Sequence, residues 1–238
     1  MAKPNHMPIA KQAKAPKTAA TSKSFSLVPA TAQQQMYKSI AALKPAVFGE
    51  ASGTEIAEIA ISLAIGANDP VILCDSARGA RAVRKVCTVA KSKSANGRFT
   101  AGTLAAVAAL IEDAKATALI CAGRLQPEED YRSAFSFAAR QKLPILYLIS
   151  NPFTPGRRQA LDLRTLYAEF GIPVFSVEAN DAIAAYRVAT EALHNARHGR
   201  GPCVVEALTF AGKGVSKDDT LSLLKDYMER HGNWPIKG

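Results

Sequence analysis

Acidic residues are missing from the front of the chain: no aspartate or glutamate precedes Glu50, whereas seven lysines do. The whole chain carries 30 basic and 20 acidic residues, for a net charge of +10, so the part beyond those lysines has only 23 basic residues against its 20 acids. Aromatic residues are also scarce, at 7%. A nucleic-acid groove combines basic side chains clustered on a folded face with aromatic stacking platforms. This charge distribution therefore predicts a protein that does not bind nucleic acid.

Residues 1–26 have no long apolar run and no arginine, since the first arginine is Arg78. A secretory signal requires an apolar stretch of roughly 7–15 residues, and a mitochondrial presequence is rich in arginine. Nor does any segment approach the ~18 apolar residues of a membrane span. Because the segment 1–26 consists largely of Ala, Lys, Pro, Thr and Ser, we expect a disordered basic arm there. We expect a single domain over 27–238, a cytoplasmic location and no membrane association.

The four cysteines include no CxxC pair, so neither a zinc site nor a redox motif is indicated. Cys74, Cys121 and Cys203 fall within apolar runs that are typical of buried strands, where a thiol behaves as a small hydrophobic group. We therefore expect reduced cysteines in the core of a cytoplasmic protein.

Short apolar runs that do not alternate with polar residues indicate strands buried on both faces; they lie at 70–74, 118–121, 144–149, 174–177 and 203–208. Helical periodicity or helix-start signals separate them, and the helices expected are 31–44, one that begins at the capping box 52–55, 77–89, 103–114, 127–140, 162–170, 181–197 and 219–231. Strands that alternate with helices predict a doubly wound α/β domain, with a mainly parallel sheet and helices on both faces. Ligands bind such sheets at the carboxyl ends of the strands, which here lead into 75–79, 122–127, 150–158, 178–181 and 209–218.

Two of these helices carry further information. The helix 127–140 has Pro127 at its start and three acids in its first turn, and we expect proline at the first helical position. Its periodicity places an apolar stripe inward, formed by Tyr131, Ala134, Phe135 and Ala138. The segment 102–110 is rich in small apolar residues almost all round, which is typical of a helix buried on every side. Either it lies inside its own domain, or Ala105, Ala106 and Ala109 contact another subunit.

Common site motifs are absent from the sequence: it contains no GxGxxG after a strand, no GxxxxGK[ST], no GxSxG and no HExxH. The segment 75–79 follows a strand, but its one glycine and one arginine are a weak anion-binding signal. A stand-alone domain that binds a small molecule remains one interpretation.

Three segments resemble a known family: 134–151 (AFSFAARQKLPILYLISN), 171–181 (GIPVFSVEAND) and 201–210 (GPCVVEALTF). Together they are similar to the alpha subunit of the dehydrogenase (decarboxylating) component of 2-oxo-acid dehydrogenase complexes, of the pyruvate and branched-chain type. The resemblance extends over roughly 27–234 and is specific from residue 134 onward. It implies a thiamine-diphosphate-binding fold, thiamine diphosphate and magnesium as cofactors, an oxidoreductase acting on 2-oxo acids, and a beta subunit that supplies the glutamate activating the cofactor.

The first cofactor motif of this family is Gly-Asp-Gly after one strand and an Asn-Asn pair after the next. Aligned without gaps, the first motif falls on 122–124, so that Gly123 takes the place of the aspartate and Arg124 follows it. The second falls on Asn151 and Pro152. Both side-chain ligands of magnesium are thereby lost, and an alignment shifted by one residue does not restore the carboxylate. Arg124 is open to two interpretations, a phosphate contact or a solvated loop arginine.

The second family motif is a Gly-His-Ser loop whose imidazole assists the reaction. Here the corresponding segment reads TFAGKGVS over 209–216, so Gly214 and Ser216 match while Val215 replaces the histidine. Valine transfers no proton. By resemblance, the cofactor-binding positions are Gly123, Arg124, Asn151, Gly214 and Ser216.

Two functions from different classes follow from these replacements. The first is an alpha-subunit-like protein that keeps the fold without the chemistry and acts as a structural or regulatory partner of a beta-like subunit or within a homo-oligomer. The second is an active dehydrogenase subunit with non-standard cofactor ligands. We expect the first, because a fold implies a site only when the site residues are present.

Overall fold

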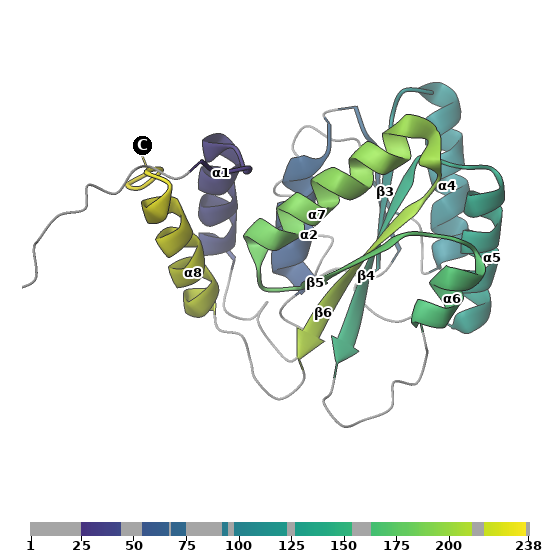
Figure 1. Ribbon diagram of the computed structural model, residues 1–238. Helices are drawn as coiled ribbons and strands as arrows, with labels where there is room; N and C mark the ends of the chain where they lie inside the picture. The colour runs from purple at the N-terminus through teal and green to yellow at the C-terminus, as the bar shows by residue number, and fades with distance from the viewer. Residues whose placement is uncertain are drawn as a thin grey trace, which may run out of the picture.

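A computed structural model describes residues 25–43, 54–66, 68–74, 92–94, 98–122, 127–153, 163–210 and 217–236. Its strands are β1 (Val71–Leu73), β2 (Ser92–Ser94), β3 (Ala118–Ala122), β4 (Ile145–Phe153), β5 (Val174–Glu178) and β6 (Cys203–Phe210). Its helices are α1 (Ala30–Ala41), α2 (Thr54–Ala64), α4 (Phe99–Glu112), α5 (Glu128–Arg140), α6 (Leu163–Glu169), α7 (Ala182–Asn195), which continues into the short π-helical turn η2 (Ala196–Arg200), and α8 (Lys217–Arg230). Figure 1 shows their arrangement.

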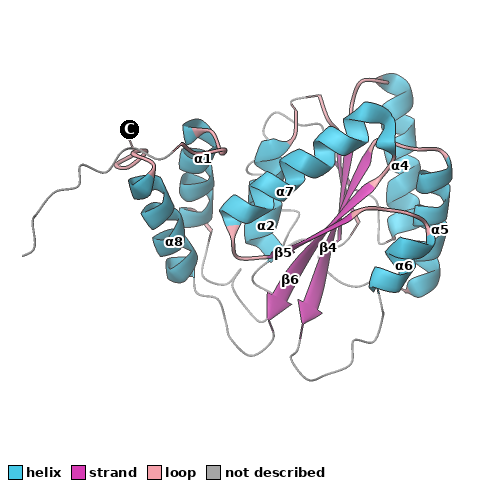
Figure 2. Cartoon of the chain, in the orientation of Figure 1, coloured by secondary structure: helices cyan, strands magenta, loops and turns pink. Residues whose placement is uncertain are grey.

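The six strands form one parallel sheet in the order β2-β1-β3-β4-β6-β5. Helices α4, α5 and α6 lie on one side of it, whereas α2 and α7 lie on the other, with α1 and α8 packed as a pair beyond them (Figures 1 and 2). The predicted doubly wound parallel sheet is therefore confirmed. Among the described residues, no helix is both long and apolar enough to cross a membrane.

Each face of the sheet carries its own apolar core, because successive strand side chains point to opposite faces. In β1, Val71 and Leu73 join the core that includes α2 and α7, whereas Ile72 joins the core of α4, α5 and α6. The predicted inward stripe of α5 is confirmed, since all four of its residues are buried. The three described cysteines are also buried and free, as expected, and burial raises the pKa of Cys203 to about 11. Cys87 lies outside the described residues.

The core beneath α4, α5 and α6 is built around packed aromatic rings. Phe135 of α5 is fully buried, and its ring centroid lies 4.9 Å from that of Tyr147, 5.6 Å from Tyr131 and 5.7 Å from Tyr167. Phe99 adds a fourth neighbour at 6.2 Å. Such tilted pairs are favoured beyond the area that they bury.

Helix α4 begins at Phe99, four residues before the predicted start at residue 103. Its N-cap residue, Arg98, makes no side-chain capping bond. Instead, the buried carboxylate of Asp130 in α5 accepts hydrogen bonds from the amides of Phe99 (2.6 Å) and Thr100 (3.2 Å) and from the Thr100 hydroxyl (2.6 Å). The expected start was wrong because the capping group comes from a different helix.

Of the two alternatives for this helix, burial wholly inside its own domain was wrong. Ala106 and Ala109 are buried against the domain's own core, whereas Leu104 is 59% and Ile111 is 79% exposed. A contact with another subunit would therefore have to use the outer face, which carries Leu104 and Ile111.

Smaller differences concern strand and helix ends. Ser92–Ser94 was not predicted as a strand, yet it forms the edge strand β2, where backbone pairing to β1 needs no apolar side chains. Strands β4 and β6 extend to residues 153 and 210, beyond the apolar runs that predicted them, because they pair with each other along that whole length. Pro127 is the N-cap residue of α5 rather than its first helical residue. The predicted helix 77–89 and the capping residues Ser52 and Gly53 lie outside the described residues.

Candidate functional site

Three of the strands that lead into the expected site segments are neighbours in the sheet. Strands β3 and β4 are neighbours, paired from Ala118 with Ile145 to Ala122 with Ile149, and β6 lies on the other side of β4. The segments that follow β3, β4 and β6 in the sequence are those that carry the expected cofactor motifs. Of the five predicted site residues the structure describes Asn151, while Gly123, Arg124, Gly214 and Ser216 lie outside the described residues.

Asn151 lies inside strand β4 rather than in a turn after it. The β4–β6 ladder runs on through Asn151, opposite Leu208, and Pro152, opposite Thr209. The expected loop at 150–158 thus starts as strand. The side chain of Asn151 is buried, with 2% of the residue exposed. Its position in the ladder fixes its side chain on the same face of the sheet as Tyr147 and Ile149.

The amide of Asn151 is bound to a buried carboxylate that the sequence analysis did not single out. Its Nδ2 donates to Oε1 of Glu206 in β6, at 2.5 Å, and the hydroxyl of Ser176 in β5 donates to Oε2 at 2.8 Å. Glu206 is 2% exposed. One side chain from each of three neighbouring strands thus joins a polar cluster, in which Asn151 and Glu206 are buried and Ser176 is exposed. The available signal was an acidic residue inside an otherwise apolar strand, which requires partners when it is buried.

Tyr167 of α6 lies in the electric field of this cluster. Its hydroxyl is buried and has no hydrogen-bond partner. Burial is the main cause that raises the pKa of Tyr167 far above its ordinary value, and the negative charge of Glu206 raises it further. The phenol is therefore neutral at every physiological pH, and neither it nor Glu206 is arranged here as a proton-transfer pair.

Two paired substitutions test the assignment of this unpartnered hydroxyl. We expect Tyr167→Phe to leave the free energy of unfolding unchanged or slightly higher, because no hydrogen bond is lost. Tyr147→Phe removes a buried hydroxyl that lies 2.9 Å from the Thr103 hydroxyl, and it should cost about 1 kcal/mol. Urea unfolding of both variants measures the difference. A loss at Tyr167 as large as that at Tyr147 would show that Tyr167 has a partner.

The described residues do not fit a magnesium–diphosphate site. Magnesium takes about six oxygen ligands in a near-octahedral arrangement. Pro152 offers no side-chain oxygen, and Asn151 is held by its amide nitrogen on Glu206. Throughout the described ranges no group of three or more His, Cys, Asp or Glu side chains is placed to hold a metal ion. The described part of this edge supplies hydrogen-bonded polar side chains rather than a set of ligands.

Comparison with known proteins gives consistent similarities. The model of the family "Dehydrogenase E1 component" matches residues 75–231. The pyruvate dehydrogenase E1 component subunit alpha of Acholeplasma laidlawii is 32% identical over 115 residues, which cover 45% of this chain and 33% of that protein. The 3-methyl-2-oxobutanoate dehydrogenase subunit alpha of Mycobacterium tuberculosis is 32% identical over 125 residues, which cover 50% of this chain and 34% of that protein. The chain thus spans about a third of the length of these curated relatives.

Solved structures are similar at a lower level. A thiamin diphosphate-dependent enzyme from Mycobacterium smegmatis matches with a TM-score of 0.46 and 15% identity, covering 67% of this chain and 32% of that one. Benzoylformate decarboxylase from Polynucleobacter necessarius matches with a TM-score of 0.48 and 11% identity, covering 71% of this chain and 33% of that one. The family model, by contrast, matches well over half of a chain whose sheet has the expected parallel order, and the chain therefore belongs to the dehydrogenase E1 component family.

Proposed function

We propose that this chain is an alpha-subunit-like member of the 2-oxo-acid dehydrogenase family that acts as a structural or regulatory subunit and not as a cofactor-binding enzyme. The observation that carries the proposal is the arrangement of Asn151 and Pro152 at the carboxyl end of β4. There Asn151 is tied to Glu206 within the sheet and Pro152 occupies the position of the second amide ligand. A side-chain oxygen for magnesium is missing where the family places one.

Two further replacements support the same function. Gly123 stands where the family has its aspartate, and Val215 stands where it has its histidine. Glycine has no side chain to bind a metal, and valine cannot carry a proton. Because these three positions belong to one constellation, their joint loss weighs more than any one replacement would.

We expect magnesium–thiamine diphosphate to bind this chain with a dissociation constant no tighter than about 1 mM, which corresponds to about 4 kcal/mol of binding free energy. Isothermal calorimetry should be run on the chain alone and on any complex that co-purifies with it. Magnesium-dependent binding in the micromolar range would instead support the alternative, an active subunit with non-standard ligands. The triple variant Gly123→Asp, Pro152→Asn, Val215→His tests whether magnesium–thiamine diphosphate binding can be restored. Gly123→Asp alone is its control.

A subunit requires a partner, and we propose a beta-like dehydrogenase chain or a second copy of this chain. The outer face of α4 supports this proposal, because Leu104 and Ile111 expose large apolar side chains on it. On the neighbouring helix α5, Phe137 is 38% exposed. Exposed apolar residues gathered on adjacent helices are a common feature of protein interfaces.

We expect an assembly that buries more than about 1,000 Å² in total, the range of specific interfaces. Ile111→Glu should raise the concentration at which the assembly dissociates into free chains by at least tenfold, because a charge would be buried at the contact. Light scattering across a dilution series measures this shift. Leu223→Glu, at a leucine on α8 that is 60% exposed, is the matched control. A monomer at every concentration, with no beta-like chain retained from its own cell extract, would rule out the subunit role.

A further inference from the structure

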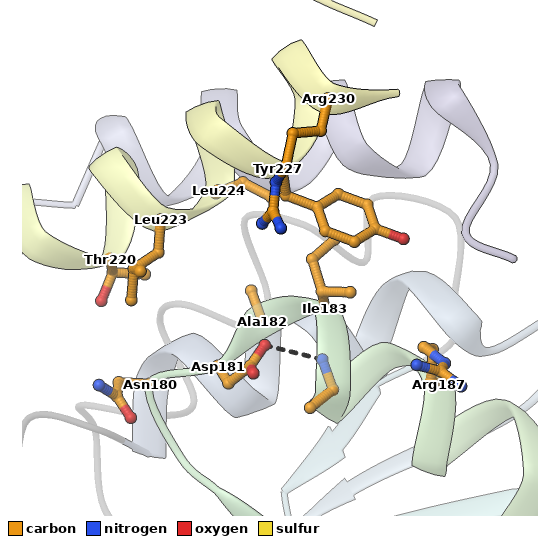
Figure 3. Close-up of a pocket in the computed structure, with 11 residues that line it drawn as sticks. Asn180, Asp181, Ala182, Ile183, Arg187, Thr220, Leu223, Leu224, Tyr227 and Arg230 are labelled. Carbon is orange, nitrogen blue, oxygen red and sulfur yellow. Dashed lines mark hydrogen bonds between the residues drawn. The ribbon is translucent and has the colours of Figure 1, made fainter. Parts of the chain in front are cut away.

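A cleft of about 350 Å³ opens between the start of α7 and the inner side of α8, away from the Asn151–Glu206 cluster (Figure 3). It lies beyond the carboxyl end of β5, since the turn at Asn180 and Asp181 leads from that strand into α7. The volume is at the small end of the range for ligand pockets. A small organic molecule therefore fits within it.

One wall of this cleft carries a buried hydroxyl with no hydrogen-bond partner. Thr220 of α8 is 2% exposed, it lines the cleft, and its Oγ1 has no partner. In Figure 3 this oxygen points from α8 toward the start of α7. A buried hydroxyl left unpaired costs free energy, so its presence at the cleft indicates a polar ligand group.

The polar surroundings of Thr220 favour an anion. The first two amides of α7, those of Ala182 and Ile183, have no acceptor within the helix, and they lie at its positive end. Arg187 and Arg230 line the same cleft. Within the described part of the chain, neither arginine forms an ion pair with a carboxylate. In Figure 3 the guanidinium of Arg230 reaches down from α8 toward α7.

One acidic residue also faces the cleft, and it is already engaged. Asp181 is the N-cap residue of α7, and its Oδ1 accepts a hydrogen bond from the amide of Ala184 at 2.9 Å. Its single negative charge is set against two arginines and the helix start. The local balance therefore remains positive.

Apart from Asn180 and the Tyr227 hydroxyl, which is bonded to Ser26, the rest of the lining is apolar. Ile183 comes from α7, while Leu223, Leu224 and Tyr227 come from α8. A bare inorganic ion would leave these side chains facing water, whereas an aliphatic group attached to the anion would cover them.

We infer that this cleft binds a small organic carboxylate with a short aliphatic tail. The carboxylate would accept hydrogen bonds from the Thr220 hydroxyl and the amides of Ala182 and Ile183, and the positive charges of Arg187 and Arg230 along the cleft would attract it. The tail would lie against Ile183 and Leu223. This inference does not depend on the proposed subunit role, because it uses neither the β4 end nor the outer face of α4.

The test uses the full-length chain, with any co-purified partner, and 3-methylbutanoate as the probe. We expect its addition to shift the backbone amide resonances of the first turns of α7 and α8, with a dissociation constant on the order of 1 mM or tighter. The neutral amide of the same acid should bind at least tenfold more weakly, because it lacks the charge. Acetate and inorganic phosphate should also bind more weakly, because they lack the tail.

Variants separate recognition from folding. Arg230→Gln should weaken binding of 3-methylbutanoate about threefold, because it removes a positive charge that lines the cleft, whereas Arg140→Gln, at an exposed arginine on α5, should leave it unchanged. Thr220→Val should weaken binding while the melting temperature of the free chain stays equal or rises, since the hydroxyl has no partner to lose. Equal binding of the neutral amide, phosphate binding as tight as that of the probe, or unchanged binding in Arg230→Gln would each overturn the inference.

Discussion

Phe135→Ala should lower the free energy of unfolding by roughly 3–5 kcal/mol, the range for removing a large aromatic side chain from a packed core. Phe135 is fully buried, and four other aromatic rings have their centroids within 6.2 Å of its own. The cavity would open between α5 and β4, where neither element can move far without breaking the sheet. Urea unfolding followed by circular dichroism measures the loss.

Phe137→Ala is the matched control, because it changes the same residue type on the same helix at a position that is 38% exposed. We expect it to cost about 1 kcal/mol or less. Circular dichroism is the better probe, since the only tryptophan, Trp234, packs on Tyr37 of α1 with ring centroids 5.1 Å apart. Its fluorescence reports that contact and not the sheet. Equal losses in the two variants would mean that the aromatic cluster does not support the domain.

Asp130→Ala should destabilise the chain by about 3 kcal/mol, because it removes the acceptor that caps α4. The amide of Phe99 would remain buried without a partner. The amide of the half-buried Thr100 would lose its acceptor, and the Thr100 hydroxyl would keep only its 3.4 Å bond to the Asp130 carbonyl oxygen. Hydrogen exchange should show the first turn of α4 opening before the rest of the domain. A protected first turn in this variant would contradict the assigned cap.

Glu129→Ala provides the comparison for this second prediction. Glu129 is the neighbouring acid in the first turn of α5 and is exposed, so its loss should cost no more than about 0.5 kcal/mol through the helix dipole. Asp130→Asn keeps one oxygen as an acceptor, and its loss of unfolding free energy should lie between those of Asp130→Ala and Glu129→Ala.

The sheet was predictable because its information is local. Each central strand is a short apolar run between polar turns, and the alternation of such runs with helices allows few arrangements besides a parallel sheet. The inward stripe of α5 followed from its periodicity in the same way. These features depend on residues within one or two turns of each other.

What could not be predicted depends on pairs that are distant in sequence. The start of α4 is fixed by Asp130, 31 residues after Phe99, and Asn151 is held by Glu206, 55 residues further on. No periodicity reports such pairs. The edge strand β2 was missed because its residues are polar, and its pairing is carried by the backbone.

The position of β6 has a consequence for synthesis of the chain. This strand is the last in the sequence, yet it lies between β4 and β5, pairing eight residues with the first and five with the second. Until the ribosome has released residue 210, those two strands have no common neighbour and each presents an open backbone edge. Open edges are templates for association between nascent chains. Protection of the emerging polypeptide by chaperones is therefore most important in the interval between completion of β4 and release of β6.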